Sequence, residues 1–281
     1  MKFISFSRNN ANSFGAVTDQ GVVDIGARLN LTDLGAALRQ VGIDAVKDLG
    51  VKSEADFGLS EIDAYRPVVA DPDKILCAGL NYDEHVQETK RQRTERPTIF
   101  MRVAESQIGH EQAILLPPES DRLDYEGEIA VVLGKGGRRI SEDKAYEHIA
   151  GFACYNDGSV RDWQMHTSQW GPGKNFEATG AFGPTLVTSD EIGETEALKL
   201  ETRLNGQVMQ HATTDMLIFS IPTLIAYCSS FITLKAGDVI VTGTPGGVGA
   251  KRNPPVFMKN GDVVEVEVSK LGVLRNHIRT E

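Results

Sequence analysis

The stretch LDYEGEIAVVLGK, residues 123–135, decides how the rest of the chain is interpreted. Its centre, from Ile129 to Leu133, is apolar throughout, which is typical of a buried strand. Glu126 and Glu128 lead directly into that run. Side chains two residues apart share one face of a strand, about 6.6 Å from each other, so these carboxylates repel unless a cation lies between them. An exposed strand end with two solvated acids is the alternative that the spacing leaves open.

A third carboxylate stands at the end of another predicted strand. The segment IAGFACYND, residues 149–157, is apolar until its last residues and ends in Asp157. Together with the two glutamates, Asp157 would supply three oxygen donors, the ligand type that Mg²⁺ and Mn²⁺ prefer. Zn²⁺ fits less well, because no set of cysteines and histidines accompanies the acids. Taken alone, Asp157 is also typical of a turn or a helix N-cap.

The segment GLNYDEHVQET, residues 79–89, carries a histidine and a carboxylate at helical spacing. His85 and Glu88 are three residues apart and therefore share one face of a short helix. A carboxylate beside an imidazole orients the ring and raises its basicity, as a water-activating base requires. A surface helix with an ordinary His–Glu pair is the alternative.

Two loops rich in glycine and proline offer groups that can bind an anion. Residues 170–184 contain Lys174, which would neutralise a substrate carboxylate or oxyanion near a metal and would otherwise be solvated. Residues 241–251, VTGTPGGVGAK, lack the spacing of a Walker phosphate loop. Their backbone N–H groups, next to Thr244, can still surround an anion; a tight turn between strands is the alternative.

Composition limits the classes of protein that the chain can belong to. The 281 residues carry a formal net charge of −10, which argues against a nucleic-acid-binding protein. No apolar run approaches the length of a membrane-spanning helix, and the N-terminus is typical of a strand, not of a signal peptide. The three cysteines are scattered and form no CxxC pair, as is usual in a reduced compartment. We therefore expect a cytoplasmic protein with no membrane or nucleic-acid partner.

The N-terminal part of the chain reads as a small unit of its own. Residues 1–70 predict an α/β unit with a helix from Asp33 to Gln40, capped by Thr32. The segment RPVVADPDK, residues 66–74, combines two prolines with two aspartates, all of which favour turns. We therefore place a domain boundary there, with a second domain over residues 71–281.

The second domain predicts an α+β fold in which strands dominate. Its short strands alternate with glycine and proline turns, which is typical of a mixed β-roll or sandwich. Helices are fewer, at Glu142–His148 with Ser141 as N-cap and at Ile221–Ser230 with Ser220 as N-cap. The predicted strands cover residues 74–79, 97–102, 126–135, 149–157, 183–189, 198–206, 238–244 and 262–272.

In this order, these segments resemble the motifs of the fumarylacetoacetate hydrolase (FAH) family. The resemblance covers roughly residues 74–278, and its motifs are GLNYDEHVQE, PTIFMR, LDYEGEIAVVLGK, GFACYNDGSVRDWQ, GPGKNFE, GDVIVTGTPGGVG and GDVVEVEV. It implies an FAH-type catalytic domain, a mixed β-roll or sandwich, in a homodimer. One departure concerns Arg102, which stands where many relatives have lysine. We expect this change to alter the rim of the pocket.

The resemblance also implies roles for individual residues. The ligands of a divalent ion, Mg²⁺ or Mn²⁺, would be Glu126, Glu128 and Asp157. The catalytic base dyad and the active-site lysine would be His85, Glu88 and Lys174. The positions that line the substrate pocket would be Arg161, Gln164 and Thr244.

The implied reaction is hydrolysis of a C–C bond in a 2,4-dioxo acid, such as an acylpyruvate or fumarylpyruvate from aromatic catabolism. His85 and Glu88 would activate a water, Lys174 would support the oxyanion, and the metal would stabilise the departing pyruvate enolate. The same site could instead decarboxylate oxaloacetate, or act as a hydratase, an isomerase or a ureidoglycolate lyase. The dyad favours hydrolysis, because decarboxylation needs only an electron sink. A non-catalytic binder of a small acid is the remaining alternative.

Overall fold

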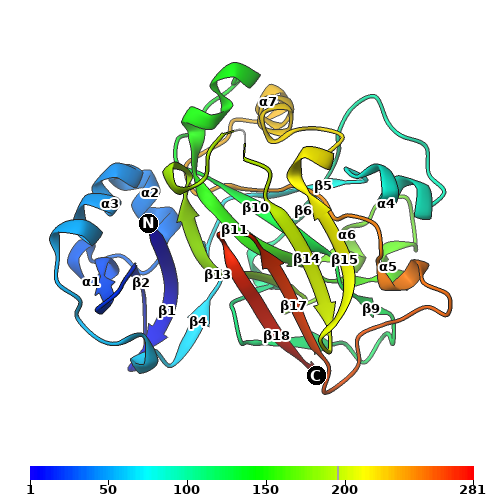
Figure 1. Cartoon of the computed structure of the whole chain (residues 1–281), viewed down its shortest axis with the longest axis horizontal. Coiled ribbons are helices and arrows are strands. Elements are labelled where there is room, and N and C mark those ends of the chain that lie inside the picture. The colour runs from blue at the N-terminus through cyan, green and yellow to red at the C-terminus, as the bar shows by residue number, and fades with distance from the viewer. Residues whose placement is uncertain (195) are drawn as a thin grey trace.

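The chain folds into two main β-sheets with helices around them (Figure 1). A computed structural model describes residues 1–194 and 196–281. The eleven strands of the large sheet follow one another as β3 (Gly21–Asp24), β2 (Ala11–Thr18), β1 (Lys2–Arg8), β13 (Gly180–Thr188), β11 (Ile149–Asp157), β10 (Gly127–Leu133), β16 (Val239–Val241), β5 (Ile75–Gly79) and β6 (Thr98–Arg102), with β4 (Ala64–Arg66) on β1 and β7 (Gln107–Ile108) on β13.

The second sheet covers one face of the first. Its five strands are β15 (Gln207–Thr213), β14 (Lys199–Leu204), β17 (Val263–Val268), β18 (Gly272–Thr280) and β8 (Ala113–Leu116), and a two-stranded ribbon joins β12 (Ser159–Val160) to β9 (Leu123–Asp124). The α-helices are α1 (Ile25–Leu29), α2 (Leu34–Gln40), α3 (Gly42–Lys52), α4 (Asp83–Glu88), α5 (Arg161–Gln164), α6 (Gly171–Lys174) and α7 (Ile221–Phe231). The 3₁₀ turns are η1 (Leu59–Glu61), η2 (Ala104–Ser106), η3 (Glu142–His148), η4 (Ser189–Glu191), η5 (Thr214–Met216) and η6 (Gly249–Lys251).

Strand β10 lies in the middle of this arrangement and is buried on both faces. Ile129 and Val131 belong to an apolar cluster shared with Val266 of the second sheet. Ala130, on the opposite face, belongs to a second cluster, shared with Leu34 of α2. A strand that is covered on both sides needs apolar residues at every position, which explains the uninterrupted run after Glu128.

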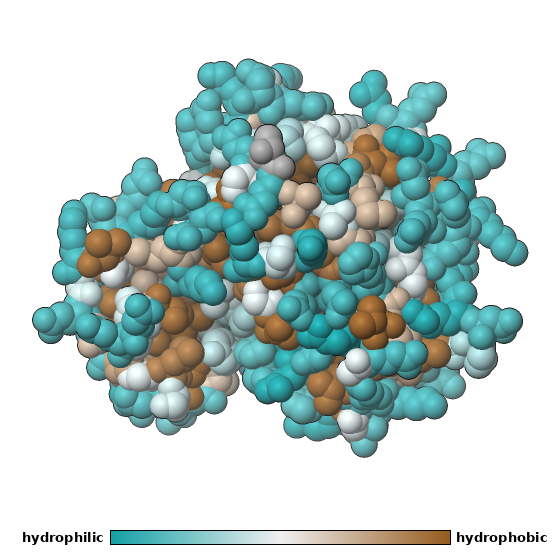
Figure 2. All heavy atoms as spheres, in the orientation of Figure 1, coloured by the Kyte–Doolittle hydropathy of each residue, from teal (hydrophilic) through white to brown (hydrophobic). Residues whose placement is uncertain are grey.

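The N-terminal segment extends the large sheet. Strand β1 pairs with β13, so strands from both sides of residue 70 form one sheet, and the division into two domains stays a prediction. The mainly-β, α+β class is confirmed. On the face seen in Figure 2, hydrophilic residues cover most of the surface, and apolar residues show in small patches over the N-terminal elements at the left and over the rest of the molecule. No helix in the described part of the chain is long and apolar enough to cross a membrane.

The structure corrects two details of the predicted helices. Helix α2, which was predicted to be capped by Thr32, is capped by Asp33, because the Asp33 carboxylate accepts the N–H of Ala36. Residues 142–148 form a 3₁₀ turn in which the Ser141 side chain makes no capping hydrogen bond. The Ser220 cap is confirmed, since its hydroxyl accepts the N–H of Thr223 at 3.3 Å.

Gly127, between Glu126 and Glu128, lies directly against the second sheet. A Cβ atom on Gly127 would lie 2.0 Å from Thr202 Oγ1 of β14. We predict that Gly127→Ala lowers the free energy of unfolding by about 1–3 kcal/mol, because a methyl group without room forces the sheets apart. Urea denaturation of the wild type and the variant measures this difference.

A double variant separates steric overlap from other causes. Thr202→Ala leaves the Cβ of residue 202 as the nearest atom, 3.3 Å from the added methyl group. The lost hydroxyl has no hydrogen-bond partner among the described residues, so Gly127→Ala with Thr202→Ala should regain most of the lost stability. Gly58→Ala, whose methyl group would lie 3.6 Å from its nearest neighbour, is the control. A double variant as unstable as Gly127→Ala would refute the steric explanation.

Candidate functional site

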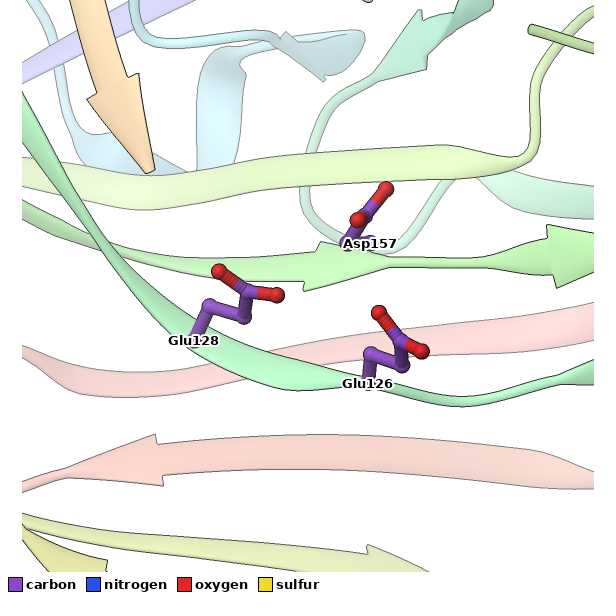
Figure 3. Close-up of side chains that lie close together, drawn as sticks. All are labelled: Glu126, Glu128 and Asp157. Atoms are coloured by element: carbon purple, nitrogen blue, oxygen red, sulfur yellow. The ribbon is translucent and has the colours of Figure 1, made fainter. Parts of the chain in front are cut away.

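Three buried carboxylates meet where β10 begins and β11 ends (Figure 3). The two strands are antiparallel, with Gly127 opposite Asn156, so Glu126 and Glu128 start one strand beside Asp157, which ends the other. One ligand oxygen from each lies within 4.8 Å of the other two. The exposed fractions of these residues are at most 4%. The sequence-predicted acids are therefore brought together and withdrawn from water.

Two buried cations hold Asp157. Lys174 Nζ lies 2.6 Å from Asp157 Oδ2 and 2.7 Å from Glu126 Oε2, between the two acids. On the other side, Arg102 donates to Asp157 Oδ1 at 2.5 Å and to Thr179 Oγ1 at 2.8 Å. Arg102 is only 2% exposed and lies behind Asp157. The expectation that Arg102 alters the rim of the pocket is therefore wrong, because its guanidinium is buried and hydrogen-bonded to Asp157 and Thr179 beneath the cavity.

Glu126 has a second basic partner. Arg161 donates from one terminal nitrogen to Glu126 at 2.6 Å and from Nε to Asp124 at 2.8 Å. Burial alone would raise the pKa of Glu126, but the charges of Lys174 and Arg161 outweigh it and lower that pKa to about 2. Glu126 is therefore ionised at neutral pH, with cations on both of its oxygens.

Glu128 differs from its neighbours because no basic side chain in the described structure pairs with it. Its only hydrogen bond there comes from the N–H of Gly243, at 2.5 Å. Burial, together with the charges of Asp157 and Glu126, raises the pKa of Glu128 well above its usual range. An all-oxygen donor set in which one carboxylate lacks a counter-charge fits a hard divalent cation such as Mg²⁺ or Mn²⁺.

His85 and Glu88 form the second functional group of the site, on helix α4. His85 Nδ1 lies 2.7 Å from Glu88 Oε1, and Glu88 Oε2 accepts the N–H of Gly247 at 2.9 Å. With Nδ1 protonated toward Glu88, Nε2 has a free lone pair, since no described residue bonds to it. The carboxylate thus fixes both the ring and the tautomer that a proton acceptor needs.

The loop 241–251 binds carboxylate side chains of the same chain. Its backbone N–H groups bind three carboxylates: Glu128 through Gly243, Glu88 through Gly247, and Asp124 through Gly249 and Ala250. Thr244 is also occupied, because its hydroxyl donates to the Gly127 carbonyl and accepts from Gln210. The loop therefore orients acidic residues of the site.

A cavity of about 190 Å³ opens onto these groups. Seven of the nine residues predicted from the sequence line it: His85, Glu126, Glu128, Arg161, Gln164, Lys174 and Thr244. Glu88 and Asp157 lie behind the lining residues, against His85 and Lys174. One terminal nitrogen of Arg161 is buried without a partner among the described residues, which leaves a donor for a ligand.

Some residues of the site were not predicted. Asp124 is fully buried and joins Arg161 to the loop 241–251. Asp124 is two residues from Glu126, as Glu126 is from Glu128. The same spacing argument could therefore have identified Asp124 as a third acid on that face of the strand. Phe100, Trp170, Arg91 and Lys251 also line the cavity, and no local pattern marks them.

We predict that Glu128→Ala abolishes binding of Mn²⁺ without unfolding the protein. Glu128 would supply one of the three oxygen ligands, and its removal leaves no buried cation unpaired. Calorimetric titration with Mn²⁺ measures the binding, and circular dichroism checks the fold. Glu84→Gln removes an exposed carboxylate near the cavity and is the control. Unchanged Mn²⁺ affinity in Glu128→Ala, or an equal loss in Glu84→Gln, would exclude this ligand set.

Comparison with known proteins identifies the family. Residues 74–279 match the model of the fumarylacetoacetate (FAA) hydrolase C-terminal domain. The oxaloacetate tautomerases Fahd2a of Rattus norvegicus and FAHD2A of Homo sapiens are each 43% identical to this chain, over 78% of it and 70% of their own length. Fumarylacetoacetate hydrolase from Exiguobacterium antarcticum is 28% identical, with a TM-score of 0.84 over the whole of both chains.

A further solved structure shares the fold. Maleylpyruvate hydrolase from Sphingobium sp. SYK-6, in complex with manganese(II) and pyruvate, has a TM-score of 0.81 at 24% identity, over 100% of this chain and 99% of its own. The prediction of a cytoplasmic location is contradicted, because the rat and human relatives are named as mitochondrial proteins. The matched domain, the identity to these relatives and the shared fold show that the chain belongs to the fumarylacetoacetate hydrolase family, which includes hydrolases, isomerases and tautomerases.

Proposed function

We propose that the protein catalyses metal-dependent proton transfer beside the carbonyl of a 2-oxo acid, and that it interconverts the keto and enol forms of oxaloacetate. One observation carries the proposal: His85, oriented by Glu88, faces the same cavity as two of the three clustered carboxylates. The names of the relatives with 43% identity support oxaloacetate as the substrate.

Residues in and around the cavity can activate and bind the substrate. A divalent ion, Mg²⁺ or Mn²⁺, held by Glu126, Glu128 and Asp157, would polarise the 2-oxo group and acidify the neighbouring carbon. Arg161 and Gln164 bind the substrate carboxylate, through the unpaired guanidinium nitrogen and the side-chain amide.

Proton transfer is assigned to His85. In the direction from keto to enol, Nε2 accepts a proton from C3, the electrons of the C–H bond form the C2=C3 double bond, and the π electrons of the carbonyl group move to its oxygen. That oxygen then takes up a proton from water, and His85 returns its proton to solvent. Glu88 stabilises the imidazolium that forms. Lys174 supports the negative charge that develops on the oxygen.

Hydrolysis of a 2,4-dioxo acid is the second candidate, because the oriented His85–Glu88 pair is also suited to activate a water. The water oxygen would bond to C4, the C3–C4 bond would break with its electrons on the pyruvate fragment, and C3 would then take up a proton. The products would be pyruvate and a carboxylic acid. Both candidates use a small anionic 2-oxo acid.

The family resemblance also suggests a homodimer, which light scattering would test.

Parallel assays with Mg²⁺ rank the two candidates. We expect keto–enol interconversion of oxaloacetate above the uncatalysed rate, followed by the ultraviolet absorbance of the enol, and loss of this activity in EDTA. Acetylpyruvate and fumarylpyruvate test hydrolysis through the release of pyruvate. Turnover of an acylpyruvate without any effect on oxaloacetate would replace the first candidate by the second. No turnover of any 2-oxo acid, with Mg²⁺ or Mn²⁺, would refute both.

We predict that His85→Ala keeps the metal and lowers the catalysed rate by about 10²–10⁴-fold, the usual contribution of a positioned base. The measurements are the rate of the favoured reaction and the calorimetric affinity for Mn²⁺. Gln87→Ala, which changes an exposed residue on the same helix, is the matched control. A rate for His85→Ala equal to that of Gln87→Ala would refute its role as the base.

A further inference from the structure

Two basic side chains line the cavity without an acidic partner. Arg161 and Lys174 are both paired with Glu126. Arg91 and Lys251 also line the cavity, but no carboxylate within the described chain lies within 4.0 Å of either charge. In a protein with a net charge of −10, two unpaired cations around one cavity indicate a place for an anion.

Arg91 is held away from the carboxylates by aromatic rings. Its guanidinium carbon lies 4.9 Å from the centre of the Trp170 ring, and Trp170 packs edge-on against Phe100 at 5.5 Å. The Phe100 ring in turn lies 4.9 Å from Lys174 Nζ. A Cβ atom on Gly79 would come within 2.4 Å of Trp170, so the indole is seated directly against β5. The rings of Trp170 and Phe100 therefore lie between Arg91 and Lys174.

The backbone that carries Lys251 is fixed by hydrogen bonds of its neighbours. Lys251 ends the turn η6, whose Gly249 and Ala250 N–H groups donate to the Asp124 carboxylate at 2.8 and 2.9 Å. The same carboxylate accepts from Arg161 at 2.8 Å. The backbone that carries Lys251 is thus tied to the residue assigned to the substrate carboxylate, while its exposed side chain is free to reach a ligand.

We propose that Arg91 and Lys251 bind a second carboxylate of the substrate, at the end remote from the 2-oxo acid. The inference rests on the proposed function and assigns side chains to the second carboxylate of a 2-oxo dicarboxylic acid such as oxaloacetate. The apolar walls formed by Phe100 and Trp170 enclose the carbon chain between the two acidic ends. Oxaloacetate and fumarylpyruvate carry a second carboxylate and acetylpyruvate does not, so within the second candidate reaction the inference favours fumarylpyruvate.

Matched pairs of 2-oxo acids test this site in the Mg²⁺-loaded protein. The pairs are 2-oxoglutarate with 2-oxopentanoate and 2-oxoadipate with 2-oxohexanoate, in which only the diacid carries a distal carboxylate. Isothermal titration measures each affinity, and oxalate reports on the metal end alone. In at least one pair we expect the diacid to bind about tenfold tighter or more, as for hydrogen bonds to a charged group.

Variants assign that preference to the two side chains. Arg91→Gln and Lys251→Gln should each reduce the diacid preference, and the double variant should abolish it, with oxalate affinity unchanged. Lys90→Gln removes a charge from the neighbouring residue, which does not line the cavity, and should keep the preference.

The outcomes separate the inference from the proposed function. Oxalate binding with no diacid preference in either pair, or a preference that survives in the double variant, would overturn the second carboxylate site alone. No oxalate binding by the Mg²⁺-loaded wild type would overturn the proposed function and this inference with it.

Discussion

The burial of four carboxylates around one cavity is the constraint on which the rest of the structure depends. Asp124, Glu126, Glu128 and Asp157 are all withdrawn from water, and an ionised carboxylate is stable there only if charges or hydrogen bonds replace its hydration. Three basic side chains, Arg102, Arg161 and Lys174, supply the charges. The loop 241–251 supplies backbone N–H groups to two of the acids. Its glycines serve this purpose: Gly247, which binds Glu88 outside the cluster, has a φ of 101° and would place a Cβ 2.2 Å from the Met209 carbonyl oxygen.

Sheet topology explains how distant segments reach these acids. Strand β16 is antiparallel to β10, with Val241 opposite Ala130, so the loop that follows β16 begins beside Glu128. Strand β5 is parallel to β16 and therefore ends at the same edge of the sheet, where α4 and His85 follow. Strand β11 ends there as well, with Asp157. One edge of the large sheet thus collects the acids, the base and the loop, while the apolar centres of the same strands fix that edge in the core.

The sequence predicted most of what alternation and local turns determine. The bounds of β11 agree with the predicted range 149–157, and the spacing of Glu126 and Glu128 placed them on one face. Strand β18 was not predicted, because the polar residue Asn276 stands among its buried positions and leaves only Leu274 and Ile278 as a clear apolar signal. The partnership of Arg102 with Asp157 spans 55 residues, and no local pattern encodes such a contact. For the same reason the loop 241–251 could be recognised as an anion binder, while the identity of its anions depended on the tertiary fold.

The charge balance of the site links metal binding to the choice of substrate. Without an ion, four buried carboxylates face three basic side chains, and Glu128 is the acid left without a cation. Burial and the neighbouring acids raise the pKa of Glu128, which favours its protonated form while no ion is bound. A divalent ion on the three clustered oxygens would favour the ionised form of Glu128, supply the counter-charge that it lacks, and add positive charge where the 2-oxo acid binds. Prior binding of the metal would then strengthen binding of the anion, because the local charge of the site outweighs the distant net charge of −10.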